Sequence, residues 1–204
     1  MEIEGLNAYQ APTELTDDPT VPEAKIEGKV YRFPCPIEEF LDDGWEIGAN
    51  NVHSEEDGEK TRFSQDQVSE VYSQKSGDIS LVKNDSSHLS LHVYNPYETA
   101  VSYDMLAATG FNTSTQPEEN LELDIVFPGE RNLNFDESDL RQWFGDDQVT
   151  VVKEGDATVI FWETDYNDNN LGSYIRYEIS NENYQGNSID LCWYHYNVTG
   201  HDGE

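Results

Sequence analysis

The sequence predicts an α+β protein in which antiparallel sheets pack against short helices, organised as two similar sub-domains. Three observations lead to this prediction: alternating apolar residues typical of strands, two short amphipathic segments with helix-capping signals, and a final run of strand candidates rich in Val, Ile, Tyr and Trp. The chain has 204 residues, enough for one or two domains, and its 12 Tyr, 8 Phe and 4 Trp can build an aromatic core although hydrophobic content is only 36%.

Residues 1–25 are predicted to be a disordered acidic linker. They contain six carboxylates, three prolines and no basic residue before Lys25, and no apolar period runs through them. Such a segment buries too little surface to offset the entropy lost on ordering. We find neither a signal peptide nor a run of 18 apolar residues, and therefore expect no membrane span in the chain.

The predicted N-terminal sub-domain covers residues 26–118 and begins with a strand at 28–33. A proline-containing turn follows, and then a short helix whose apolar face consists of Ile37, Phe40 and Leu41 and which stops at Gly44.

Further along, the pair Ser64 and Gln67 predicts a capped helix that would place Val68, Val71 and Tyr72 on one face, with a strand as the alternative. Segments 78–83 and 88–95 predict a hairpin, because a turn-rich Asn-Asp-Ser-Ser sequence separates them. One or two more strands are expected within 99–111.

The predicted C-terminal sub-domain covers residues 119–204. It opens with strict alternation over 121–127, followed by a helix in which Asp136 is the N-cap, Asp139 completes the cap, and Leu140, Trp143 and Phe144 share a face. Four strand candidates come after this helix, at 149–152, 158–164, 173–179 and 188–198. Both halves thus read as strand, Phe-Pro turn, short helix and further strands.

The charge balance limits what the protein can bind. Against 42 Asp and Glu stand 11 Lys and Arg, a formal net charge of -31. Nucleic acid and anionic membrane surfaces repel such a chain, so we exclude both as direct ligands. Three interpretations of the acidity stay open: a solvated surface that keeps an extracytoplasmic protein soluble, an acidic mimic of nucleic acid that occupies a DNA-binding protein, and adaptation to high salt.

The segments GKVYRFPCPIEEFLDDGWEI, HLSLHVYNPYETAVSYDMLAATGF and LELDIVFPGE, followed by DLRQWFGDD, carry a family resemblance. Together they resemble a group of uncharacterised secreted or lipoprotein domains of Gram-positive bacteria. The second half is similar in element order to the repeat of β-lactamase inhibitory proteins, in which a helical start packs on a four-stranded antiparallel sheet. The resemblance implies an extracytoplasmic location, with a cytoplasmic one as the alternative. It supplies no functional residues, and the inhibitory proteins' disulfide within each repeat is missing, since each half here has a single cysteine.

Few groups of residues in the sequence predict a disulfide, a metal site or a catalytic site. Cys35 and Cys192 could form a disulfide in an oxidising compartment, or remain two separate thiols. His88 and His92 fall on one face of a strand about 13 Å apart, too far to share a metal ion. Neither a nucleophile motif nor a phosphate-binding or dinucleotide-binding loop is present, so we predict no cofactor, no metal and no enzymatic activity, with an unrecognised hydrolase as a third possibility.

The most specific functional prediction is a binding surface formed by aromatic residues near the C-terminus. Tyr and Trp concentrate binding energy at interfaces, and the closing strand carries several of them. The candidate binding residues are Trp162, Tyr177, Trp193, Tyr194 and Tyr196. We therefore predict a non-catalytic extracytoplasmic interaction domain whose partner is another envelope protein or a small ligand. The alternative for these residues is that neighbouring elements cover both faces of their sheet.

Overall fold

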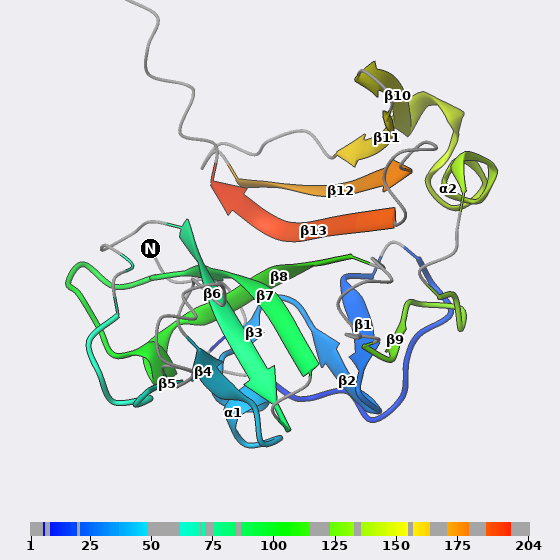
Figure 1. The fold of residues 1–204 in the computed structure, drawn as a ribbon. Coiled ribbons are helices and arrows are strands. Elements are labelled where there is room, and N and C mark those ends of the chain that lie inside the picture. The colour runs from blue at the N-terminus through cyan, green and yellow to red at the C-terminus, as the bar shows by residue number, and fades with distance from the viewer. Residues whose placement is uncertain are drawn as a thin grey trace, which may run out of the picture.

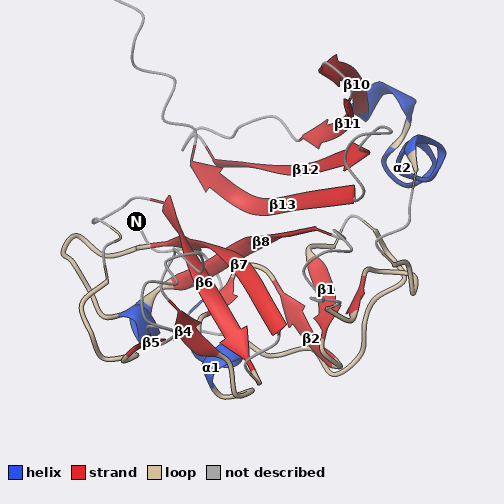
Figure 2. Ribbon diagram, in the orientation of Figure 1, coloured by secondary structure: helices blue, strands red, loops and turns tan. Residues whose placement is uncertain are grey.

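The computed structural model describes residues 6, 9–19, 21–48, 62–69, 71, 76–84, 87–114, 123–132, 136–154, 157–163, 171–179 and 187–196. Side chains are described up to Val151, apart from those of residues 62, 87, 113 and 114. Strands make up most of the described chain and helices are few and short (Figure 2), so the predicted α+β class with antiparallel sheets is confirmed.

The first half contains mainly short strands and one helical turn. Its elements are β1 (Glu23–Ile26), β2 (Lys29–Arg32), β3 (Cys35–Pro36), α1 (Glu38–Leu41), β4 (Glu46–Gly48), β5 (Arg62–Phe63), β6 (Ser76–Lys83), β7 (Ser87–Tyr94), the 3-10 turn η2 (Tyr103–Met105) and β8 (Ala107–Ser114). The second half has a longer helix and the four predicted strands. Its elements are β9 (Ile125–Val126), α2 (Glu137–Phe144), η4 (Asp146–Gln148), β10 (Val149–Glu154), β11 (Ala157–Glu163), β12 (Leu171–Ile179) and β13 (Asn187–Tyr196).

Two antiparallel sheets organise these strands (Figure 1). The smaller has the order β2-β1-β9, and the larger runs β10-β11-β12-β13-β8-β7-β6-β4-β5, with β3 paired to one end of β8. Both sheets join the two halves of the sequence, because β9 pairs with β1 and β13 pairs with β8. Two ladders therefore cross the boundary predicted near residue 118, and the division into two sub-domains stays a prediction.

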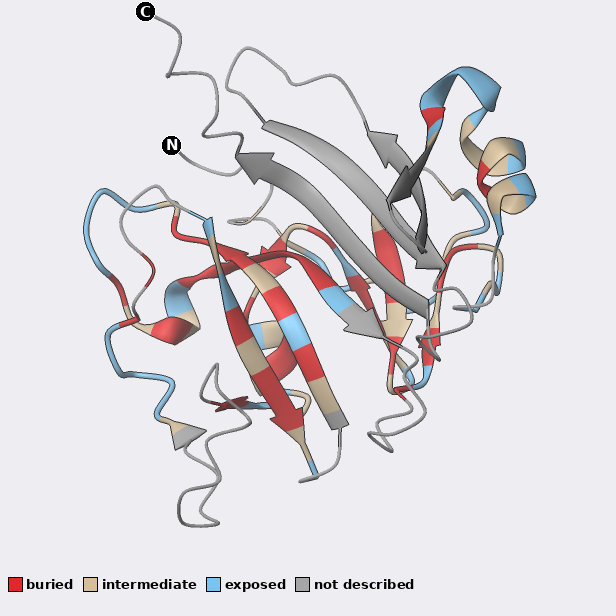
Figure 3. Ribbon diagram, turned by 45° about the horizontal axis from the view of Figure 1, so that its top comes forward, coloured by how far each residue is buried: buried red, intermediate tan, exposed pale blue. Residues whose placement is uncertain are grey.

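One hydrophobic core fills the inner side of the larger sheet. Along β6 and β7, buried residues alternate with more exposed ones, so that one face of each strand meets the core (Figure 3). The cluster also receives side chains from the smaller sheet and both helices. Its largest fully buried members are Trp45, Tyr31, Phe33, Phe40, Phe111, Ile26, Ile37, Ile47, Leu81, Leu89 and Leu91. The aromatic rings pack directly on one another; Tyr31 stacks on Phe40 with ring centroids 3.9 Å apart.

Helix α2 forms as its sequence signals predict. The Asp136 carboxylate accepts hydrogen bonds from the backbone N–H groups of Ser138 (2.8 Å) and Asp139 (3.1 Å), and the Asp139 carboxylate accepts one from the Asp136 N–H (2.9 Å). This reciprocal capping box satisfies backbone donors that the first turn leaves open. The predicted apolar face is present too: Leu140 is buried, and Trp143 and Phe144 pack against the core.

The expected linker differs from the prediction where it is described. Residues 23–25 belong to β1, Tyr9 packs against the core, and the Thr16 carbonyl accepts a hydrogen bond from the Gly129 N–H at 2.9 Å. The reason is the buried carboxylate of Glu23, whose side chain is 1% exposed. It accepts bonds from the Thr16 N–H (3.0 Å) and from Arg32 Nε (2.7 Å), which fastens the N-terminal segment to β2. Composition alone could not reveal this partner.

The segment predicted as a capped helix at 64–72 is a turn followed by an isolated bridge where it is described. Ser64 and Gln67 form a turn, with the Gln67 N–H bonded to the Ser64 carbonyl at 3.0 Å, and Val68 then makes an isolated bridge to Ser102. Pairing with a distant segment thus outweighs the local capping signal, in favour of the strand-like alternative.

Replacing Asp136 with Ala removes the N-cap acceptor of α2. We expect the free energy of unfolding to fall by about 1 kcal/mol, measured by urea denaturation at neutral pH. Glu98→Ala is the control, because Glu98 is an exposed carboxylate in a loop. Equal stability of the two variants would mean that the capping box contributes nothing.

Replacing Arg32 with Met leaves the Glu23 carboxylate buried without its guanidinium partner. We expect a loss of about 3 kcal/mol in the free energy of unfolding, because an unpaired buried charge is poorly solvated. The double variant Glu23→Gln with Arg32→Met should recover part of this loss in the same denaturation assay. If the single variant is as stable as the parent, the Glu23 carboxylate does not depend on Arg32.

Candidate interaction surface

The predicted aromatic residues lie on three neighbouring strands of the larger sheet. Trp162 is on β11, Tyr177 on β12, and Trp193, Tyr194 and Tyr196 on β13. Their side chains lie outside the described part of the structure, but the strand register is described.

A single row of directly opposite residues crosses the larger sheet from β6 to β10. It consists of Ile79, Leu91, Phe111, Leu191, Ile175, Trp162 and Val149. Directly opposite residues in a ladder share a face of the sheet. Near one end of this row Phe111 is buried, at the other end Val149 is buried, and both belong to the same core cluster. The register therefore places Trp162 directly opposite Val149, a member of the core cluster.

The register also locates the other predicted residues along these strands. Tyr177 is two positions along β12 from Ile175, and Trp193 is opposite Ser173, two positions on the other side of Ile175. Tyr194 falls at a register shift, and Tyr196, opposite Leu171, lies beyond it. The aromatic binding surface stays a prediction.

Cys35 is a free, buried thiol. Cys35 pairs with Ala108 of β8 and belongs to the core, and Cys192 pairs with Gly110 of the same strand. The two cysteines therefore both lie on strands that pair with β8, and a disulfide between them stays a sequence-based hypothesis.

The surroundings of Cys35 keep its sulfur protonated. Burial raises the pKa of this thiol, and the nearby Glu39 carboxylate raises it further. Reactive cysteines require the opposite, a lowered pKa and access to solvent. Burial likewise raises the pKa of the Tyr31 phenol, whose hydroxyl donates to the Asp43 carboxylate at 3.0 Å. Neither group is activated as a nucleophile or a base.

Four of the 11 basic side chains contact carboxylates of the same chain. Lys29 Nζ lies 3.1 Å from Glu39, Lys83 Nζ lies 2.8 Å from Asp43, and Arg141 lies 2.7 Å from Glu137. Arg32 is held by Glu23, as described above.

The histidines of β7 provide no metal site. His92 Nδ1 contacts the Asp78 carboxylate of β6 at 2.5 Å, which is a cross-strand pair. Within the described residues there is no group of three His, Cys, Asp or Glu side chains able to hold a metal ion. The described helices include none with the length and apolar character needed to span a membrane.

A surface that the sequence did not predict lies where residues 67–69 run beside residues 101–103. The Ser69 N–H donates to the Val101 carbonyl (2.8 Å), the Tyr103 N–H donates to the Gln67 carbonyl (3.2 Å), and Val68 bridges Ser102. Large apolar side chains are exposed on and near these segments. They are Val68, 61% exposed, Met105, 45% exposed, and Tyr97, 43% exposed.

Part of this exposure could be expected from the sequence. The predicted helix put Val68 and Val71 on one buried face, whereas the extended chain buries Val71 (8% exposed) and leaves Val68 outside. Tyr97 follows a proline in a turn-rich segment, where an aromatic residue has few local partners.

No protein-family profile, curated protein or solved structure matches the chain. The resemblance to secreted Gram-positive domains and to β-lactamase inhibitory proteins therefore stays a prediction.

Alkaline pH should destabilise the protein through Cys35 and Tyr31. In the folded state the pKa of Cys35 lies above its ordinary value of 9.0, and the pKa of Tyr31 lies above its ordinary value of 10.0. As pH rises, both groups therefore lose their protons in the unfolded chain before they do so in the folded protein. This difference favours the unfolded state at alkaline pH. We expect the free energy of unfolding to decline above about pH 9, by up to about 1.4 kcal/mol per pH unit for each group. Urea denaturation from pH 7 to 11 measures this decline, and Tyr31→Phe with Cys35→Ala should flatten it. An unchanged slope in that variant would contradict the assignment.

Proposed function

We propose that this chain is a non-catalytic, extracytoplasmic interaction domain whose partner is a cationic protein. The observation that carries the proposal is the charge arrangement. The net charge is -31, and four of the basic side chains are already bound to carboxylates of the same chain. A partner with a basic surface would be attracted over long range by this net charge.

The environment of the titratable core groups supports the non-catalytic part of this proposal. A general base or nucleophile needs a pKa near the working pH and contact with substrate. The buried Cys35 and Tyr31 have neither, since burial moves their pKa values upward.

Affinity capture tests this proposal. The folded chain is used as bait for envelope and cytoplasmic fractions of the source organism, with elution at about 0.15 M and then about 0.5 M salt, where the screening length falls well below 10 Å. We expect a basic envelope protein that is retained at the lower salt and weakened at the higher. Capture of DNA-binding proteins from the cytoplasmic fraction would favour the nucleic-acid mimic instead. Binding of acidic or neutral proteins, with no response to salt, would refute the proposal.

A further inference from the structure

The segment before β1 is attached to the rest of the fold at two points. It comprises residues 9–18, which we call the strap and which belong to no strand or helix. At the first point the Tyr9 ring packs against the core, and its hydroxyl accepts a hydrogen bond from the Arg32 N–H at 3.3 Å. At the second point the main chain of Thr16 bonds to β1 and to the turn after β9, as described above.

Little else holds the strap in place. No residue between positions 9 and 18 is buried, and Gln10, Ala11, Thr13 and Glu14 are exposed. The β1-β2 ladder, with four register positions, does not include the strap. Segments with few buried apolar contacts and no ladder open at a lower free energy than the strands of a sheet. The strap is therefore the part of this region that opens first.

The Tyr9 end of the strap covers a sheet edge and a thiol. β2 is the outermost strand of the smaller sheet in the described part of the structure, and its Arg32 N–H bonds to Tyr9 instead of to a further strand. The fully buried Cys35 thiol hydrogen-bonds with the same Tyr9 side chain. An uncovered sheet edge can pair with a strand of another chain, and proteins often cover such edges with a loop.

We propose that the strap is a lid that opens locally, while both sheets stay folded, and thereby uncovers the Cys35 thiol and the outer edge of β2. Opening breaks the contacts of Tyr9, and Thr16, whose main chain makes two hydrogen bonds, is the hinge. The β1-β2 ladder beneath the strap stays intact. The closed lid keeps Cys35 from reacting and β2 from pairing with other chains. This lid is independent of the proposed function, since it requires no partner.

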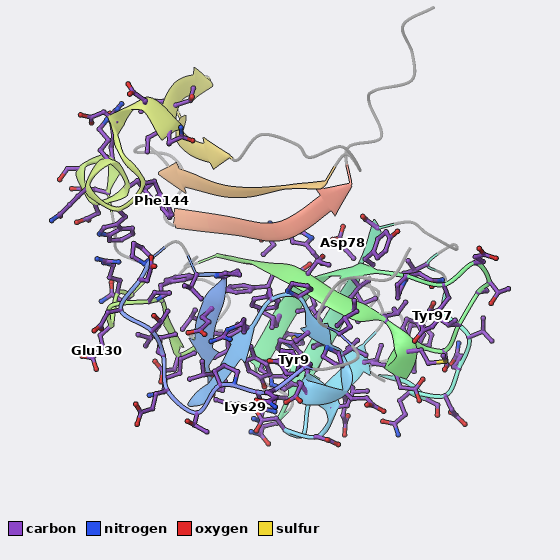
Figure 4. All side chains as sticks on the ribbon, turned by 180° about the vertical axis from the view of Figure 1, so that it is seen from behind. Tyr9, Lys29, Asp78, Tyr97, Glu130 and Phe144 are labelled. Atoms are coloured by element: carbon purple, nitrogen blue, oxygen red, sulfur yellow. The ribbon has the colours of Figure 1, made fainter. Side chains whose placement is uncertain are left out.

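Thiol labelling of the full chain tests the lid. In a Cys192→Ser background Cys35 is the one remaining cysteine, and its reaction with iodoacetamide at neutral pH is followed by mass spectrometry. We expect Tyr9→Ala to raise the labelling rate at least about tenfold, because loss of the ring removes the main apolar contact of the closed strap. The control is Tyr97→Ala, since Tyr97 is exposed and lies away from Tyr9 (Figure 4). Equal rates in the two variants would overturn the lid.

Urea separates opening of the lid from unfolding of the sheets. A local opening exposes little surface, so its equilibrium changes little with urea, whereas global unfolding responds steeply. We expect the labelling rate of Cys35 in the Cys192→Ser protein to stay nearly constant at low urea and to rise only close to the unfolding transition. A rate that rises from the lowest urea concentration with the slope of global unfolding would contradict a local opening.

Two neighbouring amides provide a matched comparison in the unaltered protein. The Arg32 N–H bonds to the strap, whereas the Phe33 N–H donates to the Pro22 carbonyl at 2.7 Å, outside the strap. We expect hydrogen exchange measured by NMR to give Arg32 a protection factor at least about tenfold lower than that of Phe33. Equal protection factors would mean that one unfolding event frees both amides, and the proposal would then be wrong.

Discussion

Pairing of β8 with β13 is the constraint on which the rest of the structure depends. Five register positions connect strands whose residues are about eighty apart in sequence, and they join the β6-β7 hairpin to the four C-terminal strands. Through this ladder the row from Ile79 to Val149 becomes one apolar face with buried residues toward both ends. The larger sheet is therefore a cooperative unit, since neither part buries its inner face alone.

Charge has two separate roles in this molecule. Individual ion pairs, such as Glu23 with Arg32 and Asp43 with Lys83, position segments that the hydrophobic core does not fix. Outside, the carboxylates far outnumber the cations, and their mutual repulsion opposes compactness while keeping the protein apart from its own copies.

The C-terminal aromatic residues predicted to form a binding surface lie on neighbouring strands of the larger sheet, and Trp162 is directly opposite Ile175 and Val149. Large apolar side chains are also exposed outside the long strands, at Val68, Tyr97 and Met105. Loops and turns can carry such residues because they vary without disturbing the ladders.

The sequence by itself determined the α+β class, the β6-β7 hairpin, helix α2 with its capping box, and the order of the four closing strands. Each of these depends on contacts between residues close in the chain, such as Asp136 with Asp139, or on a period-2 pattern. Only the tertiary structure decided that Glu23 anchors the N-terminal segment, that β13 and β3 both pair with β8, and that Val68 is exposed while Val71 is buried. These outcomes depend on which distant strand lies alongside, and a change of one register position moves every side chain to the other face.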